Sequence, residues 1–221
     1  MDWQAILLFI HILALVFWLG TDVGVFVLGK FAQNPDYSVD QRLILLKVAM
    51  ILDMFPRVFM VLTLPTGFQL AMALGAIPHE VTLIAAVWAF AAVWLAVVLV
   101  GLLCQETPIG QTAKKLEKLV HFVLLAALAW AGLASLLTGA PIALPWVAAK
   151  VLLYALILVI MQFLEKAFLP AVIGFVSLES EGSTPELEHQ IRGAMDRTYL
   201  WVLAIYAIVL ASAFLGVAKP W

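Results

Sequence analysis

The chain has a single cysteine, Cys104, among its 221 residues, which excludes an internal disulfide and a metal centre built from several cysteines. Charge is scarce too, since 12% of the residues are Asp, Glu, Lys or Arg, against roughly a quarter in soluble domains. No basic domain offers a surface for nucleic acid, so nucleic acid is excluded as a partner. No phosphate-loop, nucleophile-elbow, zinc-protease or Cys-x-x-Cys motif occurs. What is abundant is apolar sequence, at 65% of the residues.

Long apolar stretches define the expected architecture. A membrane-spanning helix needs about 20 apolar residues. Six stretches reach that length, at approximately 3–28, 47–74, 81–103, 119–138, 146–173 and 198–217. The polar connections between them are too short to bury a core of their own. The sequence therefore predicts an all-α integral membrane protein, with residues 1–221 forming one bundle of six transmembrane helices.

The distribution of basic residues predicts how this bundle is oriented. They gather in or beside the first, third and fifth connections: Lys30, Arg42, Lys47, Lys114, Lys115, Lys118, Lys166, Arg192 and Arg197. The second and fourth connections contain no Lys or Arg. Because positively charged loops stay in the cytoplasm, we expect both termini on the outer, periplasmic side. No Arg- and Ser-rich transit segment precedes the first span, which favours a multi-pass protein of the bacterial inner membrane.

Ionisable side chains within the predicted spans are the first candidates for function, because they are costly to keep in lipid. In the first span, His11, Trp18 and Asp22 are seven and four residues apart, which places them on one helical stripe. We expect this stripe to face the interior of the bundle. Lys150 lies one to two turns into the fifth span, at a depth comparable to that of His11. These two side chains could meet across the bundle, or Lys150 could extend to the headgroups.

A second set of charges lies nearer the cytoplasmic side. Asp53 and Arg57 are four residues apart in the second span, at about the depth of Asp22. We expect these three side chains to form an ionic cluster that joins the first two helices. A relay of protons or ions along them is the functional alternative. Prolines in the same span free backbone carbonyls, and Gln69 could satisfy one of them.

Three short patterns in the chain resemble a known family. They are His11 with Trp18-Leu19-Gly20, Trp146-x-x-x-Lys150 at the start of a later span, and Arg197 before a last span that ends Lys219-Pro220-Trp221. This combination is similar to the HemJ-type protoporphyrinogen oxidases, which are grouped with the CopD-like membrane proteins. The resemblance covers the first, fifth and sixth spans. Relative to that family the chain has two additional spans, and it has Thr198-Tyr199 where the oxidases tend to have Asn-Glu.

The resemblance implies a membrane redox protein that holds a b-type heme, and a quinone-linked oxidoreductase is the activity that it suggests. In that case His11 is the axial ligand of the iron, Lys150 pairs with a heme propionate and Trp18 packs against the macrocycle. Met72 is then the nearest soft candidate for a second axial ligand. A quinone or a porphyrin in the bilayer is the implied partner. Whether the chain is itself an enzyme stays open at this stage.

Other functions are compatible with the same residues. The protein could be a small transporter of a metal or a proton-coupled solute, with a polar path formed by Asp22, Asp53, Arg57 and His11. It could also be a subunit that assembles with partners or as a homo-oligomer, because small residues such as Gly132 permit close helix approach.

Overall fold

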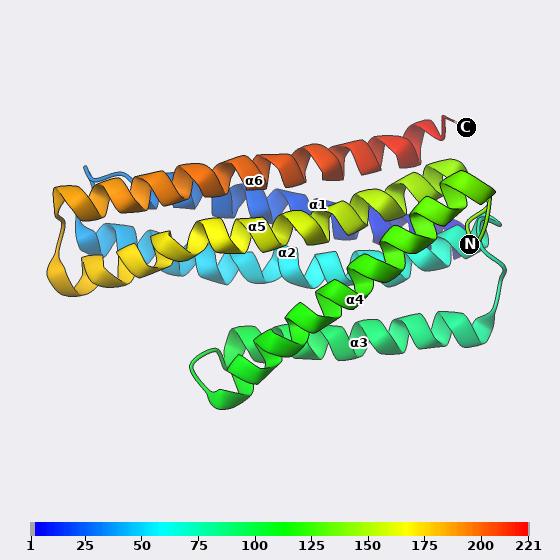
Figure 1. The fold of residues 1–221 in the computed structure, drawn as a ribbon, viewed down its shortest axis with the longest axis horizontal. Coiled ribbons are helices and arrows are strands. Elements are labelled where there is room, and N and C mark those ends of the chain that lie inside the picture. The colour runs from blue at the N-terminus through cyan, green and yellow to red at the C-terminus, as the bar shows by residue number, and fades with distance from the viewer. Residues whose placement is uncertain (1–2, 221) are drawn as a thin grey trace.

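The computed structural model describes residues 3–220 and consists of six long helices. They are α1 (Trp3–Ala32), α2 (Val39–Ala73), α3 (Val81–Leu103), α4 (Pro108–Thr138), α5 (Pro145–Glu181) and α6 (Pro185–Ala218). No strand occurs between residues 3 and 220. The predicted all-α class is confirmed, and each predicted apolar stretch corresponds to one helix (Figure 1).

Within residues 3–220, five helices are long and apolar enough to cross a membrane: α1, α3, α4, α5 and α6. The apolar sequence of α2 is interrupted by charged side chains, Asp53 and Arg57 among them. Large apolar side chains are exposed on the outer faces of the helices, as shown by Phe9 and Val93, each 64% exposed. Such a surface suits lipid tails rather than water. The chain is therefore a helical, multi-pass membrane protein.

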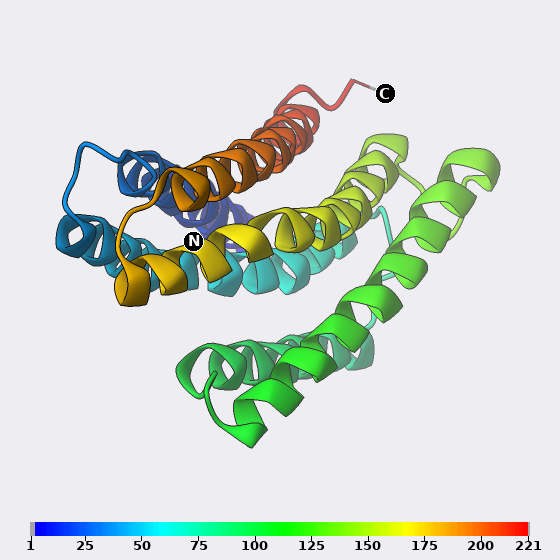
Figure 2. The same cartoon turned by 60° about the vertical axis from the view of Figure 1, so that its left-hand side comes forward.

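The helices form three antiparallel hairpins. The α1–α2 and α5–α6 hairpins lie beside each other, and both ends of the chain are at the same end of the molecule (Figure 1). The third hairpin, α3–α4, lies at one edge, where α3 contacts α2 and α4 contacts α5 (Figure 2). Helix α4 runs obliquely across the other helices, so α3 and α4 extend away from the four-helix body at one end.

Capping residues determine where the helices begin. Thr107 and Thr184 accept hydrogen bonds from backbone N–H groups in the first turns of α4 and α6, and a proline follows each threonine as the first helical residue. Ser38 forms a reciprocal capping box with Gln41 at the start of α2. Consequently α4 and α6 begin well before the spans predicted at 119–138 and 198–217, and residues expected in polar connections lie inside helices.

Several helices are longer than a bilayer is thick. Helix α5 has 37 residues, which at 1.5 Å per residue is about 55 Å, whereas the hydrocarbon core is about 30 Å thick. At the end opposite the two termini, parts of α1, α2, α5 and α6 enclose an apolar cluster that includes Phe175, Leu178 and Ile191. These apolar contacts hold the four helices together at that end of the bundle.

Arg42 is the principal polar residue of this end. The sequence places it in the first connection, but the structure places it in the second turn of α2, with its side chain only 1% exposed. Its Nε–H donates to the Ala32 carbonyl at 2.7 Å, and its two terminal nitrogens donate to the Glu188 carboxylate at 2.6 and 3.0 Å. The guanidinium also lies over the Phe175 ring. Arg42 therefore ties together the ends of α1, α2, α5 and α6.

Candidate functional site

His11 lies where α1 packs on α2, and its ring is held by Thr66. The Nδ1 atom is 2.8 Å from the Thr66 Oγ1 atom. The Thr66 hydroxyl donates its proton to the Leu62 carbonyl at 2.8 Å, so its oxygen is the acceptor toward the imidazole. Nδ1 of His11 therefore carries the proton, and the lone pair of the neutral ring is on Nε2.

Two further observations concern the ring of His11. A Cβ atom on Gly67 would lie 3.0 Å from Cε1 of His11, so glycine at this position makes room for the imidazole. Within residues 3–220, Nε2 of His11 has no hydrogen-bond partner, and it is not sealed inside the protein. One anchored and one free ring nitrogen is the arrangement found in histidines that bind metals.

Lys150 lies near His11, on the facing helix α5. Its ammonium is the charged group that acts on the His11 imidazole. A Cβ atom on Gly216 would lie 2.7 Å from Nζ of Lys150, so this glycine makes room for the amine at the end of α6. Among the ion pairs of the described residues, none involves Lys150. Lys150 is thus close enough to His11 to interact with it electrostatically, and the ammonium has no carboxylate partner within the described range.

Trp18 is in the apolar core, two turns along α1 from His11. Its side chain is buried and its ring packs edge-on against Tyr154, with 6.3 Å between the ring centroids. The Tyr154 hydroxyl donates to the Met60 carbonyl at 2.9 Å. Trp18 therefore belongs to the contact between α1, α2 and α5, and not to the immediate surroundings of the His11–Lys150 pair.

Met72 is buried near the end of α2. It follows Thr66 by six residues, which corresponds to about 9 Å along the helix and about 120° around it. Since Thr66 marks the face of α2 that contacts His11, Met72 lies on a different face and nearer the helix end. The structure does not bring Met72 and His11 together.

The three residues of the expected ionic cluster lie near one another, and the ion pair among them is between Asp53 and Arg57. Arg57 Nε donates to Asp53 Oδ2 at 2.7 Å, and this ion pair lies within α2. Asp22 is near enough to Asp53 and Arg57 to interact electrostatically, and the Tyr206 hydroxyl lies beside Asp22 without the geometry of a hydrogen bond. The ion pair therefore does not join α1 to α2, because Arg57 pairs along its own helix.

Three further residues near Arg57 were not predicted as site residues from the sequence: Glu117, His121 and Glu165. Glu117 and Glu165, from α4 and α5, act electrostatically on Arg57, and Arg57 acts on His121 of α4. We call Asp53, Arg57, Glu117, His121 and Glu165 the inner ionic cluster. Glu117 was missed because the fourth span was expected to begin at residue 119. The i,i+4 spacing of Glu117 and His121 was the available signal, because it places both on one face of a helix.

Gln69 also differs from the expectation. Its Oε1 atom accepts a hydrogen bond of 3.0 Å from Nε1 of Trp88 on α3. The hydroxyls of Thr63 and Thr66 donate to carbonyls in the turns before and around Pro65. Gln69 thus joins α2 to α3, while the two threonine hydroxyls bond back to carbonyls of their own helix.

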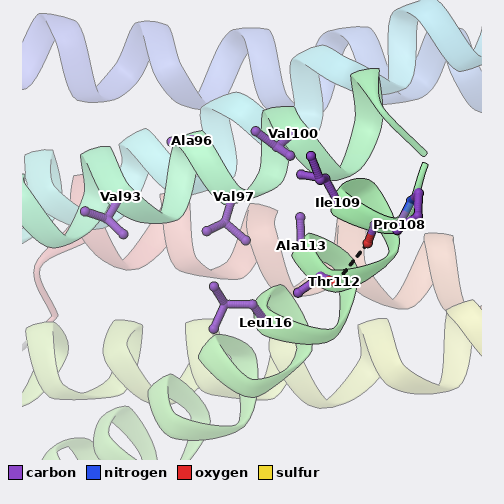
Figure 3. A pocket seen from close by; sticks show the side chains of 9 residues that line it. All are labelled: Val93, Ala96, Val97, Val100, Pro108, Ile109, Thr112, Ala113 and Leu116. Carbon is purple, nitrogen blue, oxygen red and sulfur yellow. Dashed lines mark hydrogen bonds between the residues drawn. The ribbon is translucent and has the colours of Figure 1, made fainter. Parts of the chain in front are cut away.

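The structure contains two apolar hollows at the α3–α4 hairpin. A groove of about 540 Å³ is lined by side chains from residues 93–100 of α3 and 108–116 of α4 (Figure 3). A second hollow, of about 260 Å³, lies between α2, α3 and α4 and is lined by Leu64, Phe68, Ala86, Val87, Phe90, Leu124 and Leu128. Neither is lined by His11, Trp18, Met72 or Lys150.

No family model, curated protein or solved structure matches the chain. Over residues 3–220, no group of three or more His, Cys, Asp or Glu side chains could hold a metal ion.

Proposed function

We propose that this protein binds a b-type heme in a bacterial inner membrane and acts as a redox protein, with His11 as the axial ligand. The observation that carries the proposal is the state of the His11 ring: Nδ1 is anchored by Thr66, Nε2 has no hydrogen-bond partner within residues 3–220, and Lys150 is close enough to act on the ring electrostatically. The resemblance of the His11, Trp18 and Lys150 pattern to the HemJ-type oxidases supports the same assignment.

His11 and Lys150 fit the two main requirements for binding a heme. A heme at this site would need a donor for its iron and partners for its propionates. His11 Nε2 is the donor, and Thr66 fixes its orientation. Lys150 is the partner of a propionate, and Gly216 leaves room for its amine. When bound, the heme supplies one-electron redox chemistry. Met72 lies on another face of α2, so it is not assigned to the heme.

The proposed topology has six spans, with both termini on the periplasmic side. It is supported by the position of α2, which packs along α1 over much of its length. Both termini lie at one end of the molecule (Figure 1), which requires an even number of crossings. The connections at the other end contain the basic residues, as the positive-inside rule demands of cytoplasmic loops.

The test is the visible spectrum of the full-length protein, purified after expression with ample heme supply. We expect a Soret band and a reduced-minus-oxidised spectrum of the b type, and we expect His11→Ala to lose both. His79→Ala is the matched control, because His79 is an exposed histidine in a turn near the same end of the molecule. A wild-type protein without a Soret band, or an unchanged band in His11→Ala, would refute the proposal.

The inner ionic cluster favours a second candidate function, the transport of protons or a proton-coupled solute. The charged groups of this cluster come from three helices, α2, α4 and α5. Asp53 and Arg57 are about one-third exposed, whereas His121 is buried. Proton flux into proteoliposomes that carry a pH-sensitive dye tests this function. We expect Asp53→Asn and Arg57→Gln to lower the flux at least several-fold, and flux that is equal in both variants and the wild type would exclude the cluster as the path.

A further inference from the structure

The groove between α3 and α4 is open to the surroundings of the protein and is almost wholly apolar. It lies at the end of the hairpin where the chain turns from α3 to α4 (Figure 3). Its volume of about 540 Å³ is within the roughly 300–1,000 Å³ of typical ligand sites. Thr112 is the one polar side chain that lines it, and its hydroxyl is already used, because it donates to the Pro108 carbonyl at 2.8 Å. The exposed side chains of Val93 and Ile109 lie on opposite walls.

The groove begins near one surface of the membrane. Helix α3 has 23 residues, which at 1.5 Å per residue is about 34 Å, close to the thickness of about 30 Å of the hydrocarbon core. Leu103 at its end therefore lies near a membrane surface, and α4 begins at the same level with Pro108. In the proposed topology this is the cytoplasmic surface. From there the groove runs into the hydrocarbon layer, where acyl chains and not water are in contact with an open apolar surface.

Two lysines stand beside the groove at this level. Lys114 and Lys115 lie on α4 directly before Leu116, which lines the groove. A Cβ atom on Gly101 of α3 would lie 3.4 Å from Cγ of Lys114, so the stem of this lysine lies against α3. Both lysines are exposed. Within residues 3–220 neither forms an ion pair, with Glu106 of the preceding turn or with any other carboxylate.

The acidic residues nearby are engaged by other cations. Glu117 interacts electrostatically with both Arg57 and Lys114, and the interaction with Arg57 is the larger. Glu165 is 3.6 Å from the ammonium of Lys118, one turn beyond Lys114. The first turn of α4 contains no acidic residue, and the positive end of the helix dipole lies there. The end of the groove near the membrane surface is therefore positively charged.

We infer that this groove binds one anionic phospholipid, with an acyl chain between α3 and α4 and the phosphate beside Lys114 and Lys115. The apolar walls suit the chain, and basic residues at the end of a groove between spans suit a headgroup of net negative charge. A zwitterionic lipid carries a cation of its own, which the two lysines repel. Free phosphate has no chain to fill the groove. The inference goes beyond the proposed function, requires no heme, and assigns a binding role to the α3–α4 hairpin.

The test is native mass spectrometry of the full-length protein, delipidated in a neutral detergent and titrated with dioleoylphosphatidylglycerol. Dioleoylphosphatidylcholine is the zwitterionic reference. A basic residue near the surface contributes about fivefold to the affinity for an anionic lipid. We therefore expect Lys114→Gln and Lys115→Gln each to weaken binding of the anionic lipid about fivefold, and the double variant to lose most of the preference over the zwitterionic lipid. Lys166→Gln is the matched control, because Lys166 is an exposed lysine of α5 without an ion pair among the described residues, and its affinity should equal that of the wild type.

A second pair of variants tests the apolar part of the site without changing charge. Ala96→Trp places an indole in the groove, because Ala96 is exposed on its α3 wall, and it should weaken binding of the anionic lipid several-fold. Ala89→Trp is its control, because Ala89 is exposed on α3 about one turn beyond the groove, and it should bind as the wild type does.

Four results would overturn the inference. They are equal affinity for the two lipids, an equal loss in Lys166→Gln and Lys115→Gln, unchanged affinity in Ala96→Trp, and displacement of the lipid by inorganic phosphate at the same concentration. A dimer that Ala96→Trp dissociates, with lipid binding unchanged, would show that a second copy of the chain occupies the groove and would overturn it as well. Lipid binding is measured whatever the heme content, so failure of the heme proposal leaves this result interpretable.

Discussion

Replacing Glu188 with alanine tests whether the buried ends of α1, α2, α5 and α6 depend on the charge of Arg42. The variant leaves a guanidinium that is 1% exposed without its carboxylate, whereas the Glu188 side chain is 16% exposed. Removing one partner of a buried ion pair costs about 3–5 kcal/mol, because the other charge stays desolvated. Arg42→Met should cost less, about 1–2 kcal/mol, because the freed Glu188 carboxylate can turn toward water while methionine keeps much of the packing.

The assay is the apparent melting temperature of the purified protein in detergent. For a chain of this size about 1 kcal/mol corresponds to roughly 2–4 °C, so Glu188→Ala should lower the melting temperature by about 6–20 °C. The double variant, Arg42→Met with Glu188→Ala, should be more stable than Glu188→Ala alone, because it no longer buries an unpaired charge. Asp196→Ala is the control at the same end, since the Lys30–Asp196 pair is 3.4 Å long and exposed and such pairs contribute roughly 0–1 kcal/mol. A larger loss in Arg42→Met than in Glu188→Ala, or additive losses in the double variant, would refute the reasoning.

Three glycine and threonine positions provide further predictions. Thr66→Val keeps the shape of the side chain but removes the acceptor of His11 Nδ1, so the heme content after dialysis should fall about 10–100-fold. Gly67→Ile should displace the imidazole and abolish the Soret band, because even a Cβ there would lie 3.0 Å from the ring; an unaltered band would contradict the observed packing. Gly110→Ala should lower the melting temperature sharply, because its Cβ would overlap the backbone carbonyl oxygen of Cys104 in the α3–α4 turn. Gly20→Ala is the control for both glycine variants, as nothing lies within 4 Å of that position, and it should leave stability equal or slightly higher.

The polar residues show which contacts can be predicted from the sequence and which cannot. His11 and Lys150 could be paired by depth alone, because both lie a similar distance from the same membrane surface. Asp53 and Arg57 could be placed on one face of α2, but their pairing along that helix could not be told from a contact with Asp22. The rotation of α2 against α1 decides between these possibilities, and a periodic pattern on one helix carries no information about the angle of its neighbour.

Trp94 and His121 illustrate the opposite case. In the sequence, a tryptophan in an apolar run and a histidine near a helix start are ordinary core or interfacial residues. Their contact arises from the packing of α3 on α4, which buries both rings and leaves Nε1 of Trp94 and Nε2 of His121 without hydrogen-bond partners among residues 3–220. No spacing rule within one helix identifies a contact between residues of different helices.

The amino-acid sequence by itself determined that this protein is all-α and embedded in lipid. Long apolar stretches with few charges admit few other structures, because every backbone N–H and carbonyl in a membrane must be bonded within its own helix. The tertiary structure alone decided which side chains meet: Arg42 with Glu188, His11 with Thr66, and Trp94 with His121. The physical reason is that helix formation depends on local backbone bonding, whereas these contacts depend on how separate helices rotate, tilt and pack.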